Sequence, residues 1–212
     1  MGLEKQKEKI AIGQNKKGQQ MSKEKNNNLL KQSFSAKQIT KIGMMIAFVS
    51  AMSYIRIPLP FSEAAVTGQT LAVNVIALLL TPKEALVTML CYWLLGLVGA
   101  PVFGGMAGPG KMFGPGGGYF LAFMLAAVLI AKLRGKRYHL GRYILVTVLV
   151  GLLVIDGIGF LWLKLIAKLT WEAAFFAGVV VFVPLDVLKC VVSCVVVKPL
   201  QRAMFVMEDM RE

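Results

Sequence analysis

Long apolar stretches dominate this chain, and short polar segments separate them. A helix needs about 20 apolar residues to cross the hydrocarbon core of a bilayer, and six stretches approach or reach that length. They cover residues 40–57, 65–81, 84–100, 116–133, 142–164 and 184–203. Residues 172–182 are apolar but too short to span, and they predict a short helix packed on the bundle. The pattern predicts an all-α membrane protein with six transmembrane helices.

The composition supports this class and excludes a soluble enzyme. Hydrophobic residues make up 57% of the 212 and charged residues only 17%. The net charge of +13 is concentrated, with ten of the 24 Lys and Arg in the first 41 residues and five more in the loop 132–142. Positive charge in short loops marks the cytoplasmic side. We therefore expect both termini in the cytoplasm and no nucleic-acid partner.

The same pattern predicts the domain organisation. Residues 1–35 are too polar to bury a core and predict a disordered basic cytoplasmic tail, attracted to anionic membrane lipid. Residues 36–205 form the six-helix membrane domain, and residues 206–212 a cytoplasmic C-terminal tail.

Catalytic and metal-binding chemistry has little support in the sequence. The single histidine, His139, lies in the basic loop, and the three cysteines lie inside apolar spans. No Gly-Lys-Ser/Thr sequence of a phosphate-binding loop occurs. We expect no catalytic residue, no metal and no cofactor.

An acid and a base lie inside the last apolar span, at Asp186 and Lys189. A charge at the centre of a membrane helix costs about 2.5–3.5 kcal/mol on insertion scales, so such residues face a protein interior or a cavity and mark functional sites. The i, i+3 spacing places both on one helix face. They form either part of a ligand site or a structural ion pair between helices.

Two further polar elements share the predicted outer half of the bundle. The second span carries Gln69, Thr70 and Asn74, which either line a cavity or hydrogen-bond between helices. Eight of the nineteen residues of segment 101–119 are glycine. Its free N–H groups at Gly116, Gly117, Gly118 and Tyr119 predict a cradle for a carbonyl or an anion. A flexible connector is the alternative.

The first span carries Gly43, Ala47 and Ala51 on one helix face. Small residues at this spacing allow another helix to approach closely. The face is a candidate partner surface, although the spacing also arises by chance. Asp156, the other acid at membrane depth, is either a helix contact or a pocket wall.

Four ordered motifs resemble the BioY family, the biotin-specific substrate-binding (S) components of energy-coupling factor transporters. The motifs are Pro58-Leu59-Pro60-Phe61 with Val66-Thr67-Gly68-Gln69-Thr70, Leu95-Gly96-x-x-Gly99-x-Pro101-Val102-Phe103, Gly114-Pro115-Gly116-Gly117-Gly118-Tyr119, and Phe182-x-Pro184-x-Asp186-x-x-Lys189. The resemblance covers residues 40–200. Two departures occur: Gly116 replaces the family's threonine, and Leu185 replaces its glycine.

The resemblance implies an S-component-like bundle in the bacterial cell membrane that binds biotin from outside. It also implies a transmembrane coupling subunit, contacted through Ala47 and Ala51, and two ATPase subunits that alone use ATP. Asp186 is then expected to accept from the ureido N–H groups and Lys189 to donate to the ureido oxygen. Further polar contacts are expected from Gln69 and Asn74, and cover for the thioether ring from Phe103, Phe113 and Tyr119.

Three rival interpretations remain open at this point. The first is an S component for another vitamin, such as riboflavin or thiamin. The second is an intramembrane enzyme that uses Asp186 and Asp156 as an acid pair. The third is a helical scaffold whose polar groups only hold helices together.

Overall fold

A computed structural model describes residues 35–59, 62–135 and 137–209. Residues 40–212 form one compact unit, and the preceding unit, residues 1–39, is described only from residue 35 onward. The predicted tail 1–35 and the final residues 210–212 thus lie outside the described residues, apart from Ser35. Helix α2 (Ala36–Ser53) opens the described chain.

A β-hairpin follows α2, where the sequence pattern predicted the junction of two helical spans. Strand β1 (Arg56–Leu59) pairs antiparallel with β2 (Ser62–Thr67), and Ile57 lies opposite Val66. Pro58 cannot continue the first helix, and the β-branched Ile57 in β1 and Val66 in β2 favour extended backbone. The first predicted span therefore ends four residues early and the second starts as a strand. The fold is mostly helical, and the all-α prediction is wrong at this hairpin.

The helices that follow the hairpin contribute most of the buried hydrophobic core. They are α3 (Gln69–Leu79), α4 (Pro82–Leu97), the single-turn α5 (Pro109–Met112) and α6 (Gly117–Leu133). The start of α4 is fixed by its capping residues, because Thr81 caps the helix, Glu84 reaches back to the Thr81 N–H, and Pro82 is the first helical residue. Nearly all of α3 is buried, between α10 and α6.

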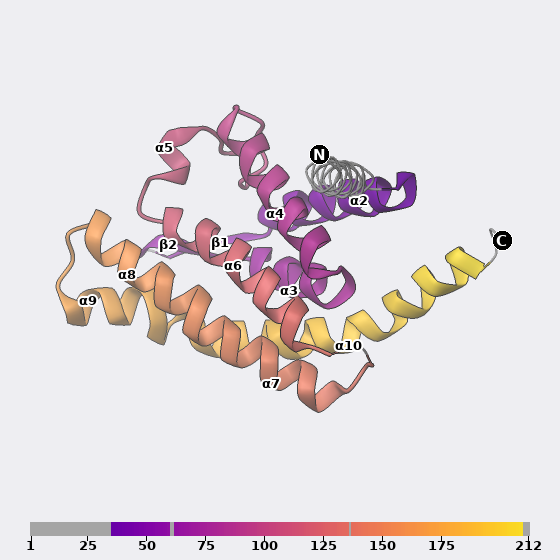
Figure 1. The fold of residues 1–212 in the computed structure, drawn as a ribbon. Helices are drawn as coiled ribbons and strands as arrows, with labels where there is room; N and C mark the ends of the chain where they lie inside the picture. Colours follow the sequence, from indigo (N-terminus) through magenta and orange to yellow (C-terminus); the bar gives the residue numbers. More distant parts are fainter. Residues whose placement is uncertain (1–34, 60–61, 136, 210–212) are drawn as a thin grey trace, which may run out of the picture. The chain divides into compact units, whose positions relative to one another are not determined.

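Two long helical segments complete the compact unit (Figure 1). The first joins α7 (Leu140–Val150), the π-helical η1 (Gly151–Asp156) and α8 (Gly157–Ile166). The second joins α9 (Trp171–Phe175), the π-helical η2 (Phe176–Val180) and α10 (Phe182–Asp209). The predicted short helix thus runs almost directly into the last span, and Pro184 lies in the first turn of α10.

The length and hydropathy of the described helices support a membrane protein. Two segments, Leu140–Ile166 and Trp171–Ala203, are long and apolar enough to span, and Gln69–Leu79 and Gly117–Leu133 are shorter apolar helices. Large hydrophobic side chains are exposed along the outer faces, including Leu145, Leu153 and Leu188. Such faces suit lipid rather than water. The count of six spans and the side on which the termini lie remain predictions.

Candidate binding site

A cavity opens between the hairpin, the Gly-rich segment and helices α3, α6 and α10. The space between its walls, counted together with the open mouth, is about 630 Å³. The lining residues are Ser53, Arg56, Ala65, Thr67, Gln69, Thr70, Phe103, Met106, Lys111, Gly116, Tyr119, Phe120, Phe123, Phe182, Asp186 and Lys189.

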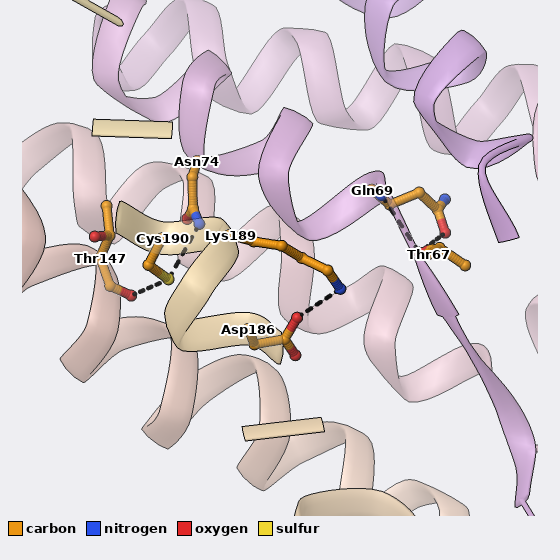
Figure 2. A network of polar contacts seen from close by, with 7 residues as sticks. All are labelled: Thr67, Gln69, Asn74, Thr147, Asp186, Lys189 and Cys190. Atoms are coloured by element: carbon orange, nitrogen blue, oxygen red, sulfur yellow. Dashed lines mark hydrogen bonds and ion pairs between the residues drawn. The ribbon is translucent and has the colours of Figure 1, made fainter. Parts of the chain in front are cut away.

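Asp186 and Lys189 form an ion pair on the cavity wall. The Lys189 ammonium lies 2.8 Å from Asp186 Oδ1, and the side chains are 16% and 6% exposed, respectively. Figure 2 shows both side chains leaving one side of α10 and meeting head to head. Because Asp186 Oδ2 and the other ammonium hydrogens are not used by this contact, the pair can still bond a ligand.

Gln69 lies on the opposite wall, at the start of α3, and its side chain is held in place. Its Nε2 donates to Tyr92 Oη at 2.6 Å, and Thr67 Oγ1 donates to its Oε1 at 3.1 Å. Tyr92 in turn donates to the Val102 carbonyl at 3.0 Å. Tyr92 thereby connects the Gly-rich segment, through the Val102 carbonyl, to Gln69, which lines the cavity.

A second set of contacts anchors the Gly-rich segment to the end of α2. Ser53 Oγ donates to the Val102 carbonyl at 2.7 Å and accepts from the Gly104 N–H at the same distance. Gly104 has φ +65°, and a Cβ there would lie 2.7 Å from the Ser53 carbonyl oxygen. Only glycine fits this conformation and this close approach without strain.

Aromatic rings form the apolar part of the cavity. Phe103 packs edge-on against Tyr92, with centroids 5.2 Å apart, and lies tilted against Phe120, with centroids 4.4 Å apart. Tyr119 stacks on Phe182 at 5.8 Å, and its hydroxyl donates to the Gly178 carbonyl. Flat apolar walls with one charged corner suit a small ring that carries polar edges.

Some residues predicted for the site do not line the cavity. Asn74 is fully buried on the other side of α10, where its Nδ2 donates to Cys190 Sγ at 3.3 Å (Figure 2). Gly117 and Gly118 are packing positions, because a Cβ would lie 1.8 Å from the Met112 carbonyl oxygen and 2.2 Å from Trp162 Cβ, respectively. Phe113 is 53% exposed and also lies outside the lining. Gly116 and Tyr119 do line it.

Two cations of the lining, Arg56 and Lys111, were missed by the sequence reasoning. Burial, with the positive charge of Arg56 adding to it, lowers the pKa of Lys111. A signal existed, since both interrupt outer segments that carry few other charges. With Lys189 and Asp186, the lining holds three cations and one anion, so its charge favours an anionic ligand. In the described ranges, no three His, Cys, Asp or Glu side chains gather as a metal site would require.

Apolar outer faces around a partly charged cavity define a membrane-embedded binding protein. The chain belongs to the BioY family, whose model matches residues 22–205. It is 34% identical over 168 residues to "Biotin transporter BioY2" of Lactococcus lactis subsp. cremoris, covering 78% of this chain and 91% of that protein. It is 32% identical over 167 residues to "Probable biotin transporter BioY" of Pyrococcus horikoshii, covering 78% and 97%.

The fold is also similar to a solved structure. The crystal structure of the S-component for biotin from an ECF-type ABC transporter superposes with a TM-score of 0.72 at 25% sequence identity. The superposition covers 80% of this chain and 95% of that one.

Proposed function

We propose that this chain is the biotin-binding S component of an energy-coupling factor transporter and mediates biotin uptake. The observation that carries the proposal is the Asp186–Lys189 pair, which faces a cavity walled by aromatic rings in a chain of the BioY family. The names of its relatives and of the similar solved structure support biotin as the ligand.

The ureido ring of biotin suits the charged corner. Asp186 accepts from a ureido N–H, and Lys189 donates to the ureido oxygen while it offsets the acid. Hydrogen bonds that involve a charged group contribute about 1.5–3 kcal/mol each. Gln69 is pre-oriented by Tyr92 to add a polar contact, and Phe103 and Tyr119 cover the thioether ring.

The carboxylate tail of biotin suits Arg56 and Lys111 at the mouth. The two cations come from the hairpin and from the Gly-rich segment. A carboxylate placed between them offsets both the burial of the Lys111 charge and its repulsion by Arg56, which together lower the pKa of Lys111. Ligand binding then draws two separate loop elements together over the cavity.

The chain itself has no ATP-binding motif, so energy comes from partners. We place it in the bacterial cell membrane as a multi-pass protein with both termini in the cytoplasm. Its partners are a transmembrane coupling subunit and two ATPase subunits. The face of α2 that carries Gly43, Ala47 and Ala51 is exposed and is our candidate contact for the coupling subunit.

A biotin titration of the purified protein, with riboflavin and thiamin alongside, tests the proposal. Asp186→Asn and Lys189→Ala each remove one charge of the pair, and we expect at least about a tenfold loss of biotin affinity from either. Glu172→Gln is the matched control, because it removes an acid from exposed α9, outside the cavity. Tight binding of another vitamin instead would reject biotin as the ligand. Biotin affinity within about threefold of wild type in both variants would place the biotin site elsewhere.

A further inference from the structure

Asp156 is a buried acid that the binding scheme does not use. It is the last residue of the π-helical segment η1, and only 1% of its surface is exposed. Neither of its carboxyl oxygens has a hydrogen-bond partner among the described residues. A buried ionised carboxylate without a partner costs several kcal/mol. The widened turns of a π-helix are frequent at functional sites.

The charged groups around Asp156 include a second acid but no base that is free to pair with Asp156 alone. Segment η1 packs against α6, α7, α8 and α10. The titratable side chains that face Asp156 are Asp186 and Lys189 of α10 and Tyr119 of α6. Within the described residues, no charged group of α7 or α8 is among its electrostatic neighbours. Lys189 is already paired with Asp186 at 2.8 Å.

The charge count of this group depends on one proton. Two ionised acids and one ammonium leave a net charge of −1 in a buried place, whereas one retained proton makes the group neutral. A carboxylic acid at Asp156 can donate its O–H to the Asp186 carboxylate, which satisfies an oxygen that otherwise has no partner. Two carboxyl groups at one site commonly share a single proton in this way.

We propose that Asp156 is a proton-binding site that positions Asp186 for the ligand through this hydrogen bond. When the proton leaves to bulk water, the Lys189 ammonium is shared between two carboxylates and less of its charge reaches the ligand oxygen. Ligand affinity therefore requires the proton. The inference rests on the proposed function, and it makes biotin binding dependent on pH.

Biotin titrations between about pH 6 and pH 10 test this linkage. The experiment uses the full-length protein in the Lys111→Arg background, in which the mouth keeps its positive charge over this range because arginine does not titrate there. We expect affinity to fall with rising pH, approaching about tenfold per pH unit, as the release of one proton requires. Asp156→Asn keeps an N–H donor and cannot release a proton, so its affinity should not change with pH. Glu172→Gln should keep the pH profile of the background.

Infrared spectroscopy of the same proteins provides a readout that does not depend on binding. The carboxylic-acid C=O band should be present at neutral pH, disappear on alkaline titration and be missing in Asp156→Asn. A flat affinity profile in the background protein, or an unchanged profile in Asp156→Asn, would overturn the proposal. So would an acid band that persists in Asp156→Asn. Absence of biotin binding at every pH would instead reject the proposed function, so the two failures are distinguishable.

Discussion

Replacing Lys111 with methionine tests the orientation of the ligand, that is, whether its carboxylate tail lies at Lys111. Lys111→Met keeps most of the length of the side chain and removes only the charge that faces the ligand tail. The lysine is half-buried, so its bond to a carboxylate lies between an exposed ion pair and a buried charge-assisted one. We therefore expect Lys111→Met to lose about 1–2 kcal/mol of binding free energy, which corresponds to a loss of biotin affinity of about 5- to 30-fold.

The comparison ligand is biotin amide, which lacks the carboxylate charge. Lys111→Met should change its affinity by less than about twofold. Lys164→Met is the matched control, because Lys164 lies over the Trp171 ring at 4.2 Å and outside the cavity lining. Calorimetric titration of the wild type, Lys111→Met and Lys164→Met with biotin and with biotin amide measures the change in affinity for each ligand. An equal loss for biotin and its amide in Lys111→Met would refute the reasoning, since it would indicate damage to the loop rather than loss of a charge pair.

The pH dependence of the acid-to-amide affinity ratio checks the same contact independently. Burial, with the charge of Arg56 adding to it, lowers the pKa of Lys111 below its usual value of 10.5. A bound carboxylate favours the protonated lysine, so the ratio should be highest below the lowered pKa and fall as pH rises through it. Lys111→Arg should abolish this fall, because arginine stays charged. A ratio that does not change with pH in the wild type would contradict the assignment.

Three substitutions test the packing and hydrogen bonds that hold the site. Gly118→Ala places a methyl group 2.2 Å from Trp162 Cβ and should lower the free energy of unfolding by about 1–3 kcal/mol, whereas Gly141→Ala, with no atom within 4 Å, should be neutral or stabilising. Tyr92→Phe leaves Gln69 Nε2 without its partner, although the Val102 carbonyl still accepts from Ser53, and should cost about 1–3 kcal/mol together with biotin affinity. Thr81→Ala removes the α4 cap and should cost about 0.5–2 kcal/mol without changing affinity. Thermal unfolding in detergent and biotin titration measure all of these.

Part of the candidate site could be predicted from residue type and spacing alone. Asp186 and Lys189 stand out because charges are rare in an apolar helix, and their i, i+3 spacing already implies one face. Gln69 and Phe103 were placed by the motifs of the family. Asn74 could not be assigned in this way, because its spacing of five residues from Gln69 turns its side chain by about 140° around the helix axis, toward Cys190 instead of the cavity.

The hairpin shows where local pattern fails. The predicted spans included residues 56–57 and 65–67 at their ends and treated residues 58–64 as a connection between two helices. The pairing of the two strands depends on hydrogen bonds between segments that meet only after the chain reverses direction between them. The same reversal brings Arg56 to the mouth of the cavity, where a helix continuing from α2 would have carried it away.

The sequence by itself determined that this is a helical membrane protein, where most of its helices lie, and that a charged pair in the last of them needs an explanation. Hydrophobic periodicity and the cost of buried charge are local properties, and a single sequence displays them. Only the tertiary structure decided which polar groups meet. It brought Arg56, Lys111 and Lys189 to one cavity, directed Asn74 away from it, and placed Asp156 beside Asp186. These outcomes depend on how helices rotate and pack against one another, which spacing along the chain does not specify.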